Sequence, residues 1–249
     1  SVFVVAQVKV AHAREYVEWM MHHTSFASLR SKKGVTADKV LSLALILLDV
    51  CHRAPVGKFS IVHINDVAFA TNLDREPAAQ LLKEVFCHIN GVNQKITFPP
   101  KDTDVDAAFR PIVVVNDEFF LQPPPMAARA ILNAVIDWCR HTWPNSSKFD
   151  EEALGPMFEE FVRQKLFDRG VTVLHGKYSL PWVEGECDAV LETEKELIFF
   201  ELKSKMLTRE GRTGNDLVAL ADLGQALVRP QAQAMERHAA LLKAGSLTL

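Results

Sequence analysis

Apolar residues recur at helical spacing through most of the first 146 residues. The segments Ala37 to Cys51 and Glu76 to His88 place apolar side chains three or four positions apart, which predicts amphipathic helices. Strand-like runs follow at Ile112 to Val115 and Phe119 to Leu121. A proline-rich turn then leads into a further helix, Met126 to Cys139. The N-terminal part is therefore predicted to be mainly helical.

A second feature of this part is a pair of short helices. A helix-like run from Ile64 to Ala70 precedes a turn, Thr71 to Asp74, and the helix that continues from Glu76. Two helices joined in this way are compatible with a DNA-reading helix-turn-helix, and any αα-hairpin gives the same pattern. Lys83 is the only basic side chain from Glu76 to the end of the second helix, so plain helical packing is the favoured interpretation and DNA reading the alternative.

The pattern changes after the polar segment Trp143 to Ser147, which indicates a domain boundary near residue 146. We therefore divide the chain into residues 1–146 and 147–249. The second part begins with a long amphipathic helix that ends before Gly170. Its predicted elements are a helix at Asp150 to Asp168, strands at Val171 to His175, Glu186 to Leu191 and Glu196 to Lys203, and a helix at Asp216 to Lys243. Helix, three strands and helix is an α/β order.

Composition narrows the class of protein only slightly. A formal net charge of −3 argues against a protein that coats nucleic acid through bulk attraction, but it does not exclude an enzyme acting on nucleic acid. The four cysteines lie far apart without zinc-site spacing, which is typical of buried thiols in a reducing compartment. No apolar run is long enough to span a membrane and no secretion signal is visible, so we expect a cytoplasmic protein without membrane contact.

The segment from Gly185 to Lys203 carries the clearest chemical pattern. Two apolar runs flank a polar middle, which predicts a β-hairpin. If its turn is centred between Glu194 and Lys195, Asp188 lies opposite Glu201 on the same face of the sheet. The two-residue period of a strand then adds Lys203 to that face, and a register slip of one residue would separate the three side chains.

These three residues point to metal chemistry. The strand that ends in Glu201 and Lys203 is apolar on both faces, so we expect it inside the sheet, where charged groups are costly unless they are paired or bind an ion. Two carboxylates with backbone carbonyls form a hard oxygen site suited to Mg²⁺, for which Mn²⁺ can substitute. Such an ion activates water and stabilises charge on a phosphate, which Lys203 could also contact. The alternative is an ordinary salt bridge at the end of a strand.

Residues from about 149 to 243 resemble the PD-(D/E)XK nuclease superfamily. The resemblance is carried by Glu186-Cys187-Asp188 and by Phe199-Phe200-Glu201-Leu202-Lys203, although Cys187 stands where a proline often precedes the aspartate. The first helix also matches the superfamily's pattern, at Gly155, Glu159, Val162, Leu166 and Gly170.

This resemblance implies a restriction-endonuclease-like core, in which helices flank a central mixed sheet. It also implies magnesium-dependent cleavage of DNA, or sometimes RNA, in restriction, repair or recombination, although some members have lost activity. A glutamate of the first helix joins the metal site in such proteins, which assigns Glu159 to the metal beside Asp188 and Glu201. Helical spacing independently puts Glu159 at the edge of the apolar stripe of its helix, within reach of the sheet.

Two further groups of residues are candidates for the site. In the last helix Gln231 shares a face with Met235, His238 and Leu242, which we expect to pack on the sheet, and we favour it over Gln233 as an active-site glutamine. A structural glutamine is an equal alternative. The loop before that helix carries basic residues that could contact phosphates, although an ordinary solvated loop has the same pattern; they are Lys205, Arg209 and Arg212.

The sequence thus predicts a magnesium-dependent nuclease that acts on nucleic acid, most readily DNA. Its N-terminal domain would place the substrate or contact a partner protein or a second copy of the chain. The main alternative is a catalytically inactive nuclease fold that serves as a nucleic-acid-binding or regulatory module. A third is a protein-interaction domain whose acidic cluster is purely structural.

Overall fold

The computed structural model describes residues 8–88, 107–203, 216–246 and 249. The chain divides into two compact units, Ser1–Phe149 and Asp150–Leu249. This division falls close to the boundary at residue 146 that the sequence indicates. Phe149 belongs to the first unit because its ring packs edge-on against Phe26 and Trp143, with ring centroids 6.0 Å apart in both pairs.

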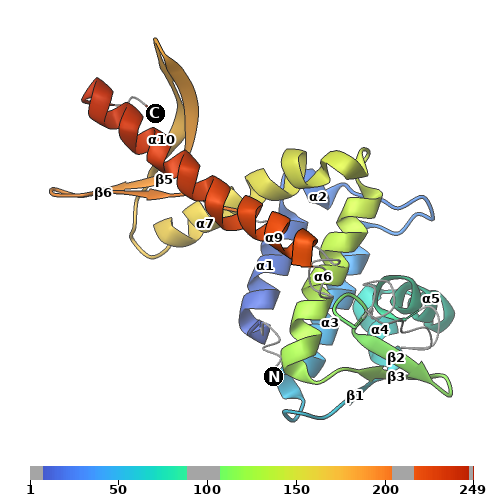
Figure 1. Ribbon diagram of the computed structural model, residues 1–249. Helices are drawn as coiled ribbons and strands as arrows, with labels where there is room; N and C mark the ends of the chain where they lie inside the picture. The colour runs from blue at the N-terminus through green and yellow to red at the C-terminus, as the bar shows by residue number, and fades with distance from the viewer. Residues whose placement is uncertain (1–7, 89–106, 204–215, 247–248) are drawn as a thin grey trace. The chain divides into compact units, whose positions relative to one another are not determined.

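The first unit is built around three long helices that run side by side, α1, α3 and α6 (Figure 1). Apolar residues at helical spacing line their shared interior, where Met20, Leu43 and Ile131 are fully buried. Pro124 occupies the first turn of α6, where its missing N–H costs no hydrogen bond. Apart from the two short helices described below, its helical elements are α1 (Val10–His22), α2 (Thr24–Ala27), α3 (Ala37–Arg53), α6 (Pro124–Thr142) and the 3-10 turn η2 (Ser146–Lys148).

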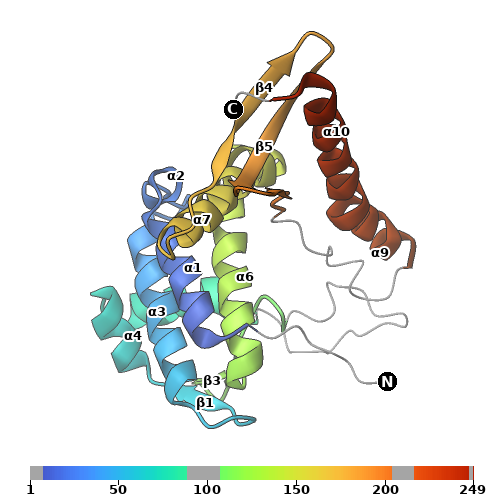
Figure 2. The same cartoon turned by 90° about the vertical axis from the view of Figure 1, so that its left-hand side faces the viewer.

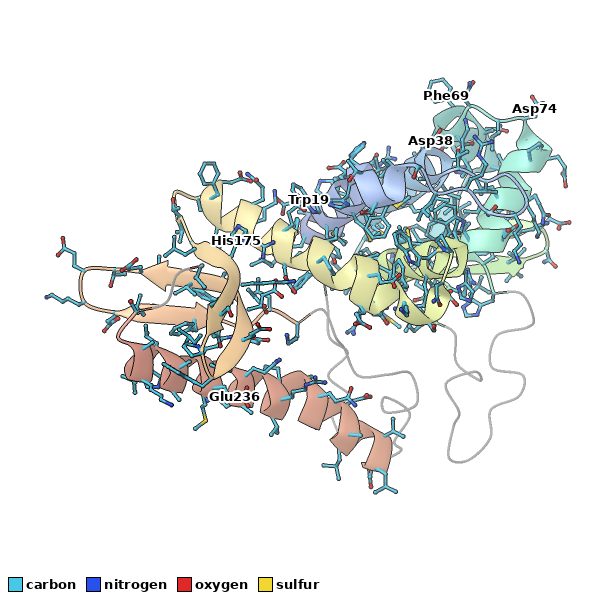
Figure 3. The ribbon with its side chains drawn as sticks, turned by 90° about the horizontal axis from the view of Figure 1, so that it is seen from above. Trp19, Asp38, Phe69, Asp74, His175 and Glu236 are labelled. Carbon is cyan, nitrogen blue, oxygen red and sulfur yellow. The ribbon has the colours of Figure 1, made fainter. Side chains whose placement is uncertain are left out.

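The predicted pair of short helices is confirmed as α4 (Ile64–Thr71) and α5 (Arg75–Phe86). They pack against each other and are joined through Asn72, whose left-handed backbone (φ 49°) ends α4. Helix α5 begins at Arg75, one residue before the predicted start at Glu76. It therefore has two basic side chains, Arg75 and Lys83, where the sequence predicted only Lys83. Phe69 of α4 projects away from the packed helices and is 90% exposed (Figure 3).

A small antiparallel sheet completes the first unit, with strand order β1-β3-β2. The predicted strands are confirmed as β2 (Ile112–Val115) and β3 (Glu118–Leu121), and β1 (Ser60–Val62) pairs with β3. Asn116 and Asp117 both have positive φ and form the two-residue turn of the β2–β3 hairpin, the geometry that matches the twist of the strands.

The second unit combines a helix, a three-stranded sheet and a long helical segment (Figure 2). Its sheet has the order β4-β5-β6 and both pairings are antiparallel. The bounds are η3 (Asp150–Leu154), α7 (Gly155–Phe167), β4 (Leu174–Leu180), β5 (Val183–Glu192), β6 (Leu197–Phe200), α9 (Asp216–Leu223), η4 (Gly224–Val228) and α10 (Arg229–Ala244). Segments η3 and η4 are π-helical turns continuous with the α-helices that follow them.

The coarse expectation of an α/β protein is therefore confirmed, with helices flanking two small antiparallel sheets. A mixed sheet was expected, but the strands in the described part of the chain pair only in antiparallel fashion. The first strand of the second unit was also expected too early, at Val171 to His175. It runs from Leu174 to Leu180 because a tight turn at Pro181 and Trp182 folds it back onto β5.

The interior strand of this sheet is β5. Four consecutive residues, Cys187 to Val190, are buried, so both faces of β5 are covered. The sequence suggested instead that the strand ending at Glu201 lies inside. Within the described residues β6 is an edge strand, and its Leu197 and Ile198 are exposed. The strand that carries Asp188 is therefore the buried one.

Close packing joins β4, β5 and α10. Tyr178 and Gly185 are register partners, and a Cβ at Gly185 would collide with the Tyr178 ring, so only glycine allows this approach. Tyr178 packs in a cluster of buried residues with Cys187, Val190 and Ala240 of α10.

Among the helices that the structure describes, none is long and apolar enough to cross a lipid bilayer.

Candidate active site

The β5–β6 hairpin has the register that the sequence predicts. Ala189 pairs with Phe200 and Glu192 with Leu197, so the same register sets Asp188 opposite Glu201. Thr193 closes the turn, because its hydroxyl accepts a hydrogen bond from the Glu196 amide at 2.9 Å. The turn is thus centred between residues 194 and 195, which confirms the assumption on which the predicted cluster depends.

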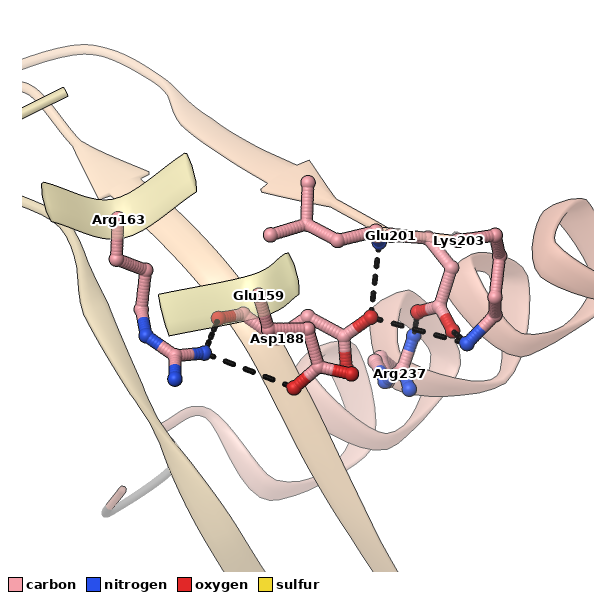
Figure 4. Close-up of polar contacts among 7 residues, drawn as sticks. Glu159, Arg163, Asp188, Glu201, Lys203 and Arg237 are labelled. Atoms are coloured by element: carbon pink, nitrogen blue, oxygen red, sulfur yellow. Dashed lines mark hydrogen bonds and ion pairs between the residues drawn. The ribbon is translucent and has the colours of Figure 1, made fainter. Parts of the chain in front are cut away.

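Asp188 is held from the facing strand. Its side chain is 7% exposed, and its Oδ2 accepts a hydrogen bond from the Leu202 amide at 2.8 Å. The Lys203 ammonium lies 3.8 Å from the same oxygen (Figure 4). The amide donor and the neighbouring cation hold this buried carboxylate in a fixed orientation.

Glu201 is equally buried and has two cationic partners. Its Oε1 forms an ion pair with Lys203, and its Oε2 forms a charge-assisted hydrogen bond with a guanidinium nitrogen of Arg237. The Lys203 ammonium therefore lies between the two carboxylates, in contact with one and 3.8 Å from the other. A cation already occupies the position in which a shared metal ion would neutralise the pair.

Glu159 approaches from α7, together with Arg163 one turn later. A guanidinium nitrogen of Arg163 lies 3.7 Å from Glu159 Oε2 and donates to the backbone carbonyl of Asp188 at 3.0 Å (Figure 4). This contact ties α7 to the buried strand β5. Burial and then the negative charge of Asp188 raise the pKa of Glu159 above its ordinary value.

The site thus combines three carboxylates with three cations. Four of these residues were predicted from the sequence, namely Asp188, Glu201, Glu159 and Lys203, whereas Arg163 and Arg237 were missed. Arg163 could have been found from its spacing, since it stands four residues after Glu159 on the same helix face. For Arg237 the only available signal was physical, because two buried carboxylates require more than one cation nearby.

The face of α10 that was expected to pack on the sheet, the ground for favouring Gln231 over Gln233, was predicted wrongly. Gln231 is exposed, and so are Met235 (63%) and Leu242 (72%) of the face expected to pack on the sheet. The inward face of α10 carries Pro230, Arg237 and Ala240 instead. Gln233 lies one turn before Arg237, and its Oε1 is buried without a hydrogen-bond partner in the described part of the chain. The prediction assumed that Met235 and Leu242 mark the inward face of α10. Arg237 lies on that inward face instead, because it pairs with Glu201.

The basic loop residues Lys205, Arg209 and Arg212 lie outside the described residues. Their predicted contact with phosphates stays a prediction.

The carboxylate oxygens at this site are of the chemical type that binds magnesium. Glu201 Oε1 is buried and accepts no hydrogen bond within the described residues, so a lone pair is free beside its contact with Lys203. Asp188 and Glu201 together offer hard carboxylate oxygens. However, the described segments contain no group of three or more His, Cys, Asp or Glu placed to hold a metal ion, and Glu159 is engaged with Arg163. The fitting ligand set is therefore the pair Asp188 and Glu201, once the Lys203 ammonium moves aside.

This chain matches no protein-family model, no curated protein and no solved structure. The arguments for a function therefore rest on the geometry of the site and on the sequence pattern that predicted it.

Proposed function

We propose that the second unit is a magnesium-dependent nuclease of the PD-(D/E)XK type that hydrolyses phosphodiester bonds of nucleic acid, with DNA as the preferred substrate. Restriction, repair or recombination is the setting in which such an activity is used. The observation that carries the proposal is the hairpin register, which gathers Asp188, Glu201 and Lys203 beside the buried stretch of β5. Unrelated surface charges rarely form such a buried cluster.

Each residue of the site has its own role in the proposed reaction. Asp188 and Glu201 would hold Mg²⁺, which when bound supplies charge stabilisation for the phosphate and lowers the pKa of water. Lys203 is one-third exposed, so its ammonium can leave the carboxylates and contact a phosphate oxygen. Arg163 keeps α7 and its Glu159 against β5 through the Asp188 carbonyl.

Cleavage by the full chain tests the proposal. Supercoiled plasmid, single-stranded DNA and RNA are incubated with Mg²⁺ or Mn²⁺, with a chelator as the blank. We expect metal-dependent cleavage, and a loss of ~10²–10³-fold in Asp188→Asn and in Lys203→Met, the range found when one charge-stabilising group is removed from an active site.

Two variants serve as matched controls. Glu194→Gln changes an exposed acid of the hairpin turn, and Lys195→Met changes an exposed lysine of the same turn. Both are expected to cleave as well as the parent chain. Absence of cleavage on every substrate, or full activity of Asp188→Asn and Lys203→Met, contradicts the proposal.

A second candidate is a catalytically inactive nuclease fold that binds nucleic acid or regulates a partner. It is favoured by one observation, the match of three carboxylates by three cations, since such a network is stable without any metal. Calorimetry separates the candidates. Saturable Mg²⁺ or Mn²⁺ binding that disappears in Glu201→Gln supports the nuclease, whereas DNA binding without metal binding supports the inactive module.

A further inference from the structure

Arg237 is the one buried Lys or Arg among the residues that the structure describes, with 8% of its surface exposed. It lies on α10, 36 residues after Glu201, and its guanidinium pairs with Glu201 Oε2 (Figure 4). Burying a guanidinium is unfavourable unless it is paired with good geometry. Packing alone therefore does not explain an arginine at this position.

The approach of α10 to the sheet makes the contact feasible. Ala240, one turn beyond Arg237, is buried in the cluster that contains Tyr178 and Cys187. Its small side chain lets the helix come close to β5. Arg237 consequently reaches the carboxylate from the helix side, whereas Lys203 reaches it from the strand side.

The two oxygens of Glu201 have different partners. Oε2 is taken by Arg237, and Oε1 contacts the ammonium that lies between Glu201 and Asp188. A carboxylate fixed through one oxygen cannot rotate freely, so its other oxygen keeps facing Asp188. Oε1 is also one of the buried side-chain oxygens that accept no hydrogen bond within the described residues.

We infer that Arg237 is a positioning residue of the metal site: it holds Glu201 by Oε2 so that Oε1 stays directed at the space shared with Asp188. This inference rests on the proposed nuclease function. Arg237 itself would touch neither metal nor substrate. It belongs to the outer shell of groups that hydrogen-bond to metal ligands and orient them.

Two effects of removing Arg237 oppose each other. Loss of a cation near the site strengthens the binding of a divalent ion, whereas loss of the hydrogen bond that orients Glu201 weakens it. The orienting effect is expected to dominate, because the guanidinium contacts Oε2, whereas the cation between the two carboxylates, Lys203, contacts Oε1. Removal of outer-shell partners typically weakens metal binding by ~10–100-fold.

The test measures metal affinity and catalysis separately in the full chain. Arg237→Gln should raise both the calorimetric Kd for Mn²⁺ and the Mg²⁺ concentration for half-maximal cleavage by ~10–100-fold. The rate at saturating Mg²⁺ should stay close to that of the parent. Arg237→Lys, which keeps the charge, should recover part of the affinity. Arg229→Gln, an exposed arginine at the start of the same helix, is the matched control and should bind metal normally.

Circular dichroism and a thermal melt in chelator check the fold of each variant, and Arg237→Lys decides the matter if Arg237→Gln does not fold. Unchanged or tighter metal binding by the folded variants overturns the inference and leaves the nuclease proposal standing. Absence of metal binding by the parent chain overturns both.

Discussion

The three carboxylates of the site differ in how each is held. Asp188 accepts a hydrogen bond from a backbone amide, Glu201 is clamped between two cations, and Glu159 faces one arginine on its own helix. Asp188, Glu201 and Lys203 could be predicted because a single local turn determines their register. Arg237 could not, since its burial depends on how a helix distant in sequence packs on the sheet.

Glu159 offers a pH-dependent test at the level of one residue. Its pKa is raised above the ordinary value of 4.5, first by burial and then by Asp188. A carboxyl group with a raised pKa in the folded chain binds its proton more tightly there, so it reduces stability as the pH rises above 4.5. Glu159→Gln, which cannot ionise, is therefore expected to have a higher Tm than the parent at pH 7.

This stabilisation should vanish as the pH falls below 4.5, where Glu159 is protonated in both the folded and the unfolded parent and carries the same charge as the variant. Thermal melts in chelator from pH 4 to pH 8 measure it. Glu160→Gln removes the carboxylate of the exposed neighbour on the same helix and is the matched control. A Tm at pH 7 that is equal to or below that of the parent shows that the environment of Glu159 is not the one described.

At the scale of elements, the helices and the β5–β6 hairpin follow from the sequence more closely than the rest of the sheets does. The long apolar periodicities match α3, α5 and α6, and the register of the β5–β6 hairpin follows from its polar turn. The β4–β5 turn at Pro181 and Trp182 was missed because the first strand was expected to end at His175, and the contact of Gly185 with Tyr178 was missed with it. Such a contact between neighbouring strands is visible only in three dimensions.

The contact between Gly185 and Tyr178 predicts the effect of a single methyl group. Gly185→Ala sets its Cβ against the tyrosine ring, and overpacking of this kind costs about 1–3 kcal/mol. Urea unfolding measures the loss. Gly224→Ala is the matched control, since no atom lies near a Cβ at that helical position and no loss of stability is expected. Equal stability of the two variants contradicts the packing of β4 on β5.

The helix pair α4–α5 gives a test for the first unit. Arg75, Gln80 and Lys83 are exposed along α5, as a helix that contacts nucleic acid requires. If this helix contacts phosphates, Arg75→Ala combined with Lys83→Ala should weaken DNA binding by the full chain and make its salt dependence shallower by about two counterions. Lys32→Ala, an exposed lysine before α3, should change neither quantity. If the salt dependence of DNA binding is unaltered in the double variant, α5 does not contact phosphates.

At the scale of the whole molecule, each unit carries its own buried thiols. Cys51, Cys87 and Cys139 are buried in the first unit and Cys187 in the second, all four as free thiols. Burial raises the pKa of Cys51 and of Cys87 to about 12, and that of Cys187 above its ordinary value, so the folded chain should resist alkylation. The reactivity of Cys187 therefore reports on unfolding of the second unit.

Because Cys187 adjoins Asp188, metal binding should protect it. A ligand that binds only the folded state at 100 times its Kd stabilises that state by about 2.7 kcal/mol. In moderate urea, saturating Mg²⁺ is accordingly expected to slow alkylation of Cys187 by roughly 100-fold, as peptide mass mapping would measure. The Asp188→Asn chain should show no protection. Equal alkylation rates of Cys187 with and without Mg²⁺ contradict a metal site in this unit.

The most direct measurement locates the ion itself. Crystals of the full chain soaked in Mn²⁺ and measured at the manganese absorption edge should give an anomalous peak within about 2.6 Å of a carboxylate oxygen of both Asp188 and Glu201. The Lys203 ammonium should be displaced from between them. A peak elsewhere, or no peak with Lys203 still bridging the two carboxylates, contradicts the account.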